Sequence, residues 1–334
     1  MLMPMNPAQP VTATRPSDET CLPIALHAQW GVPFSTMMRP GPAIAVVIPA
    51  GPIDDIDDTI ESVLTFIDSP RKIVIINDTD GRDLGEIAAR SSDIEIIEPI
   101  NSHATRGGRL MENIAAAYLH LLSTFEFDVL LRMDADALIV GPGLAEVAAA
   151  RFAEDQRIGL LGANRIDAGG NPRDWSWASR TLSRSCGAWG LRHPKTRRLL
   201  RRLRTDAISH GYEEGEAPQG GGYIHSPALV RAMSDRGLLS PSGLAQCHLG
   251  EDQIFGLLAY ACDFAIGEFS GPHGPLAVRW RGLNAPPQAL IDQGALVVHS
   301  VRFFGDLGEK EIRGWFSDHR KDFNSRQADT SSQL

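Results

Sequence analysis

Two carboxylates stand two residues apart at the end of an apolar run. The stretch "DVLLRMDADALIV" (residues 128–140) carries Asp134 and Asp136 after a predicted buried strand. Side chains at i and i+2 of a strand share one face, so the two carboxylates are expected side by side. Burying two like charges is costly unless a positive group lies between them. The strand therefore either ends at solvent or leads to a cation, and hard oxygen ligands suit Mg2+ or Mn2+ bound to a diphosphate.

The plain alternative is that Asp136 caps the following turn while Asp134 faces solvent. A second carboxylate pair, Glu251 and Asp252, opens a predicted apolar helix in "LGEDQIFG" (249–256). Interaction with the helix dipole explains one of these two residues but not both, and the other is a candidate general base for a hydroxyl group.

The elements that position these residues follow from hydrophobic periodicity. Short apolar runs alternate with segments of helical spacing, which predicts a parallel sheet with helices on both faces and an α/β fold. The predicted strands are 43–50, 71–78, 94–100 and the run ending at Asp134, and the predicted helices are 54–67, about 82–90 and about 107–124. Ligands of such sheets bind beyond the carboxyl ends of the strands, where small and polar residues converge here.

The second half of the chain is less regular. Residues 155–190 are rich in Gly, Arg and Trp, and "GGGYIHS" (220–226) allows the backbone to approach a ligand closely. The further expected elements are a basic helix at 194–205, an apolar helix at about 227–236, a helical segment within 248–264 and a closing strand at 295–301. Residues 1–40 are expected to form a loose arm with a short packed piece around Trp30–Phe34.

Composition narrows the class of protein. The chain has 334 residues, of which 43% are hydrophobic and 22% charged, as in ordinary soluble globular proteins. Its formal net charge of −9 argues against a nucleic-acid partner. The four cysteines are far apart and form no CxxC pair, which favours a reducing compartment. We see neither a signal peptide nor an apolar window of about 18 residues, so a cytoplasmic protein is expected.

The order of these motifs resembles the GT-A nucleotide-sugar glycosyltransferases over roughly residues 43–303. The resemblance rests on the first apolar strand, Asp78 at the end of the second, the D-x-D triplet, "GGGYIHS", "GEDQIFG" and "VVHSVR". The middle motifs are most similar to fringe-type and beta-1,3-galactosyltransferase-type inverting members, whereas "NDTDG" and "RGGRLMEN" resemble the bacterial family-two type. The resemblance implies a GT-A (Rossmann-like), mostly parallel sheet. It divides the chain into a nucleotide-sugar-binding half (41–150), an acceptor-binding and catalytic half (151–305) and a C-terminal tail (306–334).

The resemblance also implies roles for individual residues. Mn2+ or Mg2+ would be held by Asp134, Asp136 and His299, and the catalytic carboxylates would be Asp252, the base, and Glu251 beside it. The implied donor-binding residues are Pro49, Ala50, Asp78, Arg109, Asn113 and Ala135. The implied acceptor-binding residues are Gly221, Gly222, Tyr223 and Trp189.

Each of these roles has a simpler alternative. A lone histidine in an apolar run, such as His299, is often a packed core residue. Arg109 and Asn113 could mark only the solvated start of a helix, and Asn77 departs from the family, which often has a second Asp there. Trp189, like Trp175 and Trp177, could stack on a sugar or anchor a long loop.

The sequence therefore predicts a metal-dependent inverting glycosyltransferase with a UDP-sugar donor and a glycan, lipid-linked or small-molecule acceptor. A nucleotidyltransferase would carry a Gly-rich loop with Arg or Lys after the first strand, where this chain has "PAGPIDD", and a phosphohydrolase would carry its D-x-D near the first strand. An inactive nucleotide-sugar-binding protein would not need Glu251 and Asp252. The basic run 195–204 has two interpretations. It is either the solvated face of a helix, or a contact with a negatively charged partner, which would be the inner face of an anionic membrane or a phosphorylated acceptor.

Overall fold

A computed structural model describes residues 41–104, 106–240 and 243–331 of the chain, except for the side chain of Trp189. The predicted N-terminal arm, including Trp30–Phe34, lies outside these residues. None of the helices in the described part is long and apolar enough to cross a membrane.

The centre of the fold is a seven-stranded sheet with the order β3-β2-β1-β4-β7-β6-β8. Its strands are β1 (Ile44–Ala50), β2 (Arg71–Asn77), β3 (Ile94–Ile97), β4 (Val129–Met133), β6 (Ile158–Gly162), β7 (Gly222–His225) and β8 (Ala265–Glu268). Neighbouring strands are parallel except at β7, which is antiparallel to both β4 and β6. The predicted α/β fold with a mostly parallel sheet is confirmed, and the antiparallel strand was not foreseen.

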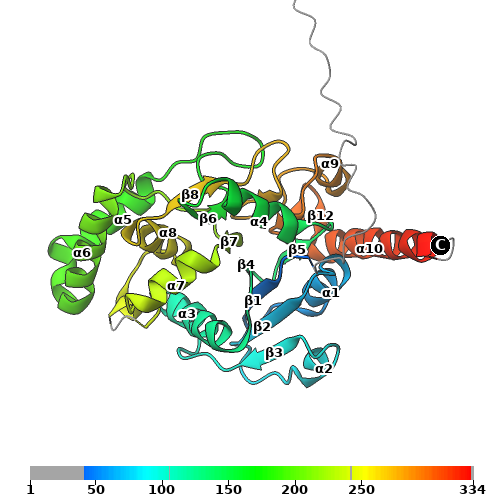
Figure 1. The fold of residues 1–334 in the computed structure, drawn as a ribbon, viewed down its shortest axis with the longest axis horizontal. Helices are drawn as coiled ribbons and strands as arrows, with labels where there is room; N and C mark the ends of the chain where they lie inside the picture. Colours follow the sequence, from blue (N-terminus) through cyan, green and yellow to red (C-terminus); the bar gives the residue numbers. More distant parts are fainter. Residues whose placement is uncertain (1–40, 105, 241–242, 332–334) are drawn as a thin grey trace, which may run out of the picture. The chain divides into compact units, whose positions relative to one another are not determined.

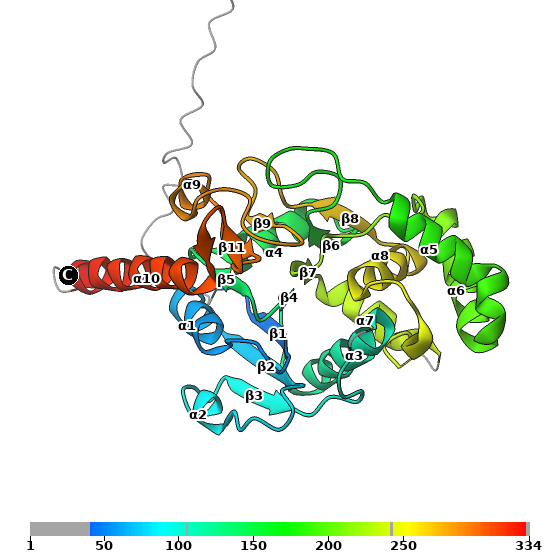
Figure 2. The same cartoon turned by 180° about the vertical axis from the view of Figure 1, so that it is seen from behind.

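Helices cover both faces of this sheet because successive residues of its strands point to opposite sides. On β1, Val46 and Ile48 pack with α1 (Asp57–Phe66) and α4 (Leu144–Glu154). Val47 points the other way and belongs to a second hydrophobic cluster. That cluster includes side chains from four helices, α3 (Gly107–Thr124), α6 (Pro194–Ser209), α7 (Pro227–Asp235) and α8 (Glu251–Ala261) (Figures 1 and 2).

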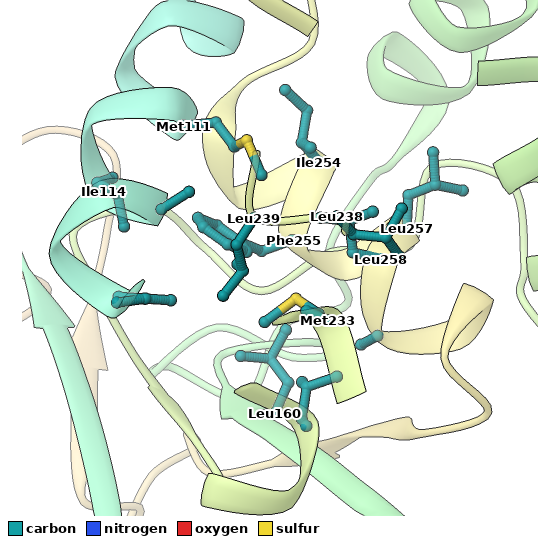
Figure 3. Close-up of a cluster of buried hydrophobic side chains, with 14 of the residues drawn as sticks. Met111, Ile114, Leu160, Met233, Leu238, Leu239, Ile254, Phe255, Leu257 and Leu258 are labelled. Atoms are coloured by element: carbon teal, nitrogen blue, oxygen red, sulfur yellow. The ribbon is translucent and has the colours of Figure 1, made fainter. Parts of the chain in front are cut away.

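The core on the second face is built from long aliphatic and aromatic side chains of α3, α7 and α8. Figure 3 shows Phe255 of α8 among them, with Met111 and Ile114 of α3 and Met233 of α7 nearby. This packing holds the first turn of α8 against the sheet, which matters because that turn carries Glu251 and Asp252. The smaller elements are α2 (Gly85–Ala88), α5 (Ser176–Cys186), and two 3-10 helices, η1 (Ala188–Arg192) and η2 (Leu244–Gln246).

A second, three-stranded sheet adds the C-terminal part of the chain to the edge where the D-x-D lies. It consists of β5 (Ala137–Ile139), β10 (Val297–His299) and β9 (Leu276–Val278). The antiparallel pairing of β5 with β10 places His299 opposite Ala137. It therefore brings residues more than 150 positions apart in the sequence to one place.

Helix α9 (Pro287–Asp292) precedes β10 in the chain. Beyond β10 lie the hairpin of β11 (Phe303–Phe304) and β12 (Leu307–Gly308) and the long helix α10 (Glu309–Ser331). Arg313 and Arg320 of α10 both contact the carboxylate of Asp58 on α1. The segment expected as a C-terminal tail is thus largely a helix that packs on the fold (Figure 1).

Candidate functional site

The D-x-D triplet lies in a turn and not in a strand. β4 ends at Met133, and residues 134–136 connect it to β5. The turn is closed by the Ala137 N–H, which donates to the Asp134 carbonyl oxygen at 3.1 Å. It is fixed to the Gly-rich loop by the Asp134 N–H, which donates to Gly221 O at 3.0 Å. Strand alternation is therefore not what brings the two carboxylates together; they converge because the turn directs both toward β10.

His299 stands between these carboxylates. Its Nε2 lies 3.4 Å from Asp134 Oδ2 and 3.2 Å from Asp136 Oδ1. Its Nδ1 lies 2.7 Å from the carbonyl oxygen of Arg279. A ring nitrogen that faces a carbonyl oxygen must carry the hydrogen, which leaves the Nε2 lone pair of the neutral ring available to a metal.

These three residues fit a divalent cation. Each offers one ligand atom, and the three atoms lie within 4.8 Å of one another. Two carboxylates and one imidazole suit Mn2+ or Mg2+ with open positions for phosphate oxygens. Without a cation, burial opposes charge on the ring, but the two carboxylates outweigh it and raise the pKa of His299 to about 9. The cluster thus stabilises a positive charge at this position.

Arg302 connects the cluster to the end of β1. Its Nε donates to Asp136 Oδ2 at 2.7 Å, and its Nη2 donates to Asp54 Oδ1 at 3.1 Å. The other oxygen of Asp54 accepts the Gly51 N–H at 2.8 Å. Burial raises the pKa of Asp136, but His299, Arg302 and Ser300 lower it well below its usual range. Sequence reasoning gave Arg302 no role, although it is the last residue of the quoted "VVHSVR".

Arg132 is a second residue that sequence reasoning missed. Its side chain is only 1% exposed, and its Nη2 lies 2.7 Å from Asp134 Oδ1 and 3.0 Å from Glu251 Oε1. Its guanidinium also lies over the Tyr223 ring, 5.4 Å from the centroid. The signal was an arginine inside the apolar run "DVLLRM", since a buried guanidinium requires carboxylate partners. Arg132 thereby joins the candidate metal site to the start of α8.

The two carboxylates of α8 occupy different surroundings. Glu251 is buried against Arg132, whereas Asp252 accepts the Gly220 N–H on Oδ2 at 3.1 Å and the Gln253 N–H on Oδ1 at 2.8 Å. Burial raises the pKa of Asp252 in spite of these bonds. Burial, together with the charges of Asp252 and Asp134, raises the pKa of Glu251 to about 7 although Arg132 opposes it. The helix N-cap is Gly250, so neither carboxylate is the capping residue.

The Gly-rich loop passes directly beside His299. Gly221 has φ +105°, and a Cβ there would lie 2.2 Å from His299 Nδ1, so a side chain at this position would displace the ring. Gly222 begins β7 opposite Met133. The Tyr223 side chain is fully buried beneath the loop, against Arg132, so it supports the site from within the core. Trp189 lies in η1, and its side chain is outside the described residues.

Two of the residues predicted to bind the donor hold the loop that follows β3. The carboxylate of Asp78 accepts the N–H groups of His103 and Ala104 at 2.8 and 3.0 Å. The Asn113 amide accepts the Asn101 N–H at 2.8 Å and donates to the Asn101 carbonyl at 2.9 Å. Both side chains therefore act on the backbone of residues 101–104.

The remaining predicted donor residues differ in exposure. Pro49 and Arg109 are partly exposed, whereas Ala50 and Ala135 are buried. The Ala135 carbonyl accepts the Thr59 hydroxyl at 2.6 Å and Arg313 Nη2 at 3.0 Å. Helix α10 thus helps to hold the backbone between the two D-x-D carboxylates.

Comparison with known proteins finds only a weak likeness to solved structures. No protein-family model and no curated protein matches the chain. Among solved structures, glucosyl-3-phosphoglycerate synthase from Mycobacterium tuberculosis in complex with Mn2+, UDP and glucosyl-3-phosphoglycerate is 17% identical, with 75% of each chain covered and a TM-score of 0.37. The same synthase with Mg2+ and UDP is 17% identical, with 75% of this chain and 74% of that chain covered and a TM-score of 0.36. At these values the likeness carries no argument about function.

Proposed function

We propose that the chain is a metal-dependent nucleotide-sugar glycosyltransferase of the GT-A type. The observation that carries this proposal is the convergence of Asp134, Asp136 and His299 just beyond the carboxyl end of β4. Ligands of mostly parallel sheets bind at that edge, and this set of ligand atoms suits a cation that bridges to a diphosphate. The sequence motifs also follow one another in the same order as in the GT-A glycosyltransferases that they resemble, which supports the same activity.

The chain's own residues would place the donor along the strand ends. Asp134, Asp136 and His299 would hold a divalent cation, and such a cation would compensate the negative charge that develops on the diphosphate leaving group. The loop held by Asp78 and Asn113 borders the same edge and would receive the nucleoside, a UDP group in our proposal. Gly221 lets the Gly-rich loop pass against the His299 ring, and it thereby keeps that ring in place beside the two carboxylates.

Asp252 is the proposed base, with inversion at the anomeric carbon. Each carboxylate oxygen can accept two hydrogen bonds, so the two backbone bonds to Asp252 still leave a position for an acceptor hydroxyl. Its raised pKa makes it a stronger base than an ordinary aspartate. Glu251, paired with Arg132, would instead keep that arginine in place. The acceptor is a glycan, a lipid-linked sugar or a small molecule.

The first experiment is a thermal-shift screen of UDP-, GDP- and dTDP-sugars with and without Mn2+, followed by detection of released nucleoside diphosphate. A bound donor at 100 times its dissociation constant stabilises the protein by about 2.7 kcal/mol. Metal-dependent binding with release of nucleoside diphosphate supports transfer. Release of pyrophosphate in a parallel assay that supplies a nucleoside triphosphate and a sugar phosphate would identify a nucleotidyltransferase. Binding of a nucleotide-sugar without any release would identify an inactive nucleotide-sugar-binding protein.

The proposed base is tested by Asp252→Asn. The amide keeps the shape but cannot take the proton, so kcat should fall by about 10²–10⁴ while donor affinity and melting temperature hardly change. Glu251→Gln is the matched control and should lose less. If Asp252→Asn keeps more than about a tenth of wild-type turnover, Asp252 is not the base. NMR of the product separately tests inversion at the anomeric carbon. A retained configuration would reject inversion but not glycosyl transfer itself.

Contact with an anionic membrane through residues 195–204 stays a prediction, as does the cytoplasmic location. On α6, Arg198, Arg201 and Arg202 are exposed, whereas Arg204 is paired with Glu214. Cosedimentation with phosphatidylglycerol vesicles, compared with neutral vesicles, tests the contact. Binding that is equal for both kinds of vesicle would contradict it.

A further inference from the structure

A basic cavity of about 710 Å³ lies among the start of α3, η1, the start of α6 and the segment after η2. Five of its lining residues are basic: Arg106, Arg192, His193, Arg197 and His248. None of the described lining residues is Asp or Glu, and none belongs to the metal-ligating cluster. In a chain with a formal net charge of −9, such a concentration of basic residues without an acidic one stands out.

Two of the three arginines of this cavity bond to neutral groups. Arg106 Nη1 donates to Gln246 Oε1 at 2.8 Å, and Arg197 Nε donates to the carbonyl oxygens of Cys186 and Gly187, both at 3.0 Å. By contrast, Arg132 and Arg204 each contact a carboxylate. Neutral acceptors orient a guanidinium but leave its charge uncompensated. The cavity is therefore suited to a ligand that brings negative charge.

The kind of anion follows from the side chains. The guanidinium fork matches the oxygens of a phosphate group, and a phosphate monoester carries close to two negative charges at neutral pH. Arg106, Arg192 and Arg197 supply three positive charges, more than a single carboxylate would need. Ser185 lies on the same lining, but its hydroxyl already donates to the Thr181 carbonyl oxygen at 2.8 Å, so the charged donors are those of the arginines.

The cavity lies beside the start of α8. His248 comes three residues before Glu251 in the chain. A Cβ on Gly107, next to Arg106, would lie 2.0 Å from the Leu249 carbonyl oxygen, so the start of α3 packs closely on the segment that leads into α8. A ligand in the cavity therefore contacts the chain on either side of that packing.

We propose that this cavity binds a phosphate monoester group, either on the acceptor or on a free ligand. The site itself does not depend on the proposed glycosyl transfer; only its assignment to the acceptor rests on that function.

The test begins with calorimetric titration of inorganic phosphate into the full chain, without donor or metal and at ionic strength held constant with NaCl. Arg106→Gln and Arg192→Gln should each weaken binding by about tenfold or more, since a hydrogen bond to a charged group contributes about 1.5–3 kcal/mol. Arg198→Gln is the matched control, because Arg198 is exposed on the same helix as Arg197 but does not line the cavity. It should bind phosphate within about twofold of wild type.

Two results would overturn the site: no phosphate binding by the wild type in the millimolar range, or an equal loss in Arg198→Gln, which would indicate general charge attraction. Arg197→Lys provides a further variant that keeps the charge while removing the fork, and it should also weaken binding. Unchanged melting temperatures show that the variants are folded. Because these titrations contain no donor, they remain decisive even if the chain transfers no sugar.

The source of the phosphate is then distinguished by kinetics. If it belongs to the acceptor, Arg192→Gln should raise KM for a phosphorylated acceptor about tenfold or more and leave KM for its unphosphorylated analogue and for the donor unchanged. If phosphate binds but neither KM changes, the cavity takes a free phosphorylated ligand. Both results support the site, and the titration alone decides whether it exists.

Discussion

His225 and His299 are both buried histidines at the end of a strand, yet the charged groups beside the two rings have opposite signs. His225 is 0% exposed and His299 is 4% exposed, so burial opposes a charge on either ring. Burial and the charge of Arg132 lower the pKa of His225 to about 3. Two carboxylates raise the pKa of His299 to about 9 in spite of burial. Burial alone therefore does not tell a core histidine from a candidate ligand; the charges beside the ring do.

The largest expected effect comes from removing the negative charges beside His299. Asp134→Ala or Asp136→Ala should abolish Mn2+-dependent donor binding and lower turnover by at least about 10³-fold, because the charge compensation of a metal amounts to several kcal/mol. The fold should remain, because the carboxylate that is left still contacts the His299 ring. Calorimetry of UDP with Mn2+ measures the effect. Unchanged binding in both variants would refute the metal site.

The next effect separates the two histidines directly. His299→Gln should weaken Mn2+ affinity roughly tenfold or more, whereas His225→Gln should leave it within about twofold. His225 is the matched control because it is equally buried and also ends a strand. Titration of the metal-free proteins with Mn2+ gives both affinities. Equal affinities in the two variants would make His299 a core residue like His225.

The sequence around the two histidines could not distinguish them, because "YIHS" and "VVHS" both place His-Ser after an apolar run. Their difference arises from strand pairing. His225 pairs with Leu130 within the central sheet, whereas His299 pairs with Ala137, one residue after the D-x-D. Only the order of motifs indicated His299, and it did so through resemblance.

The difference between local patterns and contacts across the fold also explains which elements could be predicted from the sequence. Helix α3 was predicted at its observed bounds, 107–124, because its apolar periodicity is local. The short helix α2 (Gly85–Ala88) was predicted too long, at about 82–90. The antiparallel β7 and the ion pairs of Arg132 with Glu251 and of Arg302 with Asp136 depend on contacts between distant segments, and no local pattern identifies these partners.

A smaller effect is the pH dependence of stability in the metal-free protein, and its sign differs between the histidines. His299 has a folded pKa of about 9, above the ordinary value near 6.5, so its stabilisation is complete below about pH 6.5 and is lost as the pH rises toward 9. His225 has a folded pKa of about 3, so its stabilisation is present above about pH 6.5 and is lost as the pH falls. Each slope is at most about 1.4 kcal/mol per pH unit.

Chemical denaturation in EDTA between pH 5 and 9 measures both slopes. His299→Gln should flatten the alkaline side, and His225→Gln should flatten the acid side between about pH 6.5 and 5, above the range where most carboxylates titrate. If the alkaline slope persists in His299→Gln, another group causes it, and the two histidines would not differ in their effect on stability as proposed.

The smallest effect on metal binding, no change at all, is expected from a variant that tests whether the hydrogen bond of His225 serves the fold alone. The Tyr118 hydroxyl lies 3.2 Å from His225 Nδ1, and both residues are fully buried. Tyr118→Phe keeps the ring but leaves that nitrogen without its partner, so the free energy of unfolding should fall by about 1–3 kcal/mol. Mn2+ affinity should not change, because this bond lies on the Arg132 side of the site and not between the metal-ligating carboxylates. A double-mutant cycle with His225→Gln isolates the bond, since the two residues are in contact and should be coupled. If Tyr118→Phe instead weakens Mn2+ binding as much as His299→Gln does, the two histidines act in one network through Arg132, and the separation between core and ligand histidine fails.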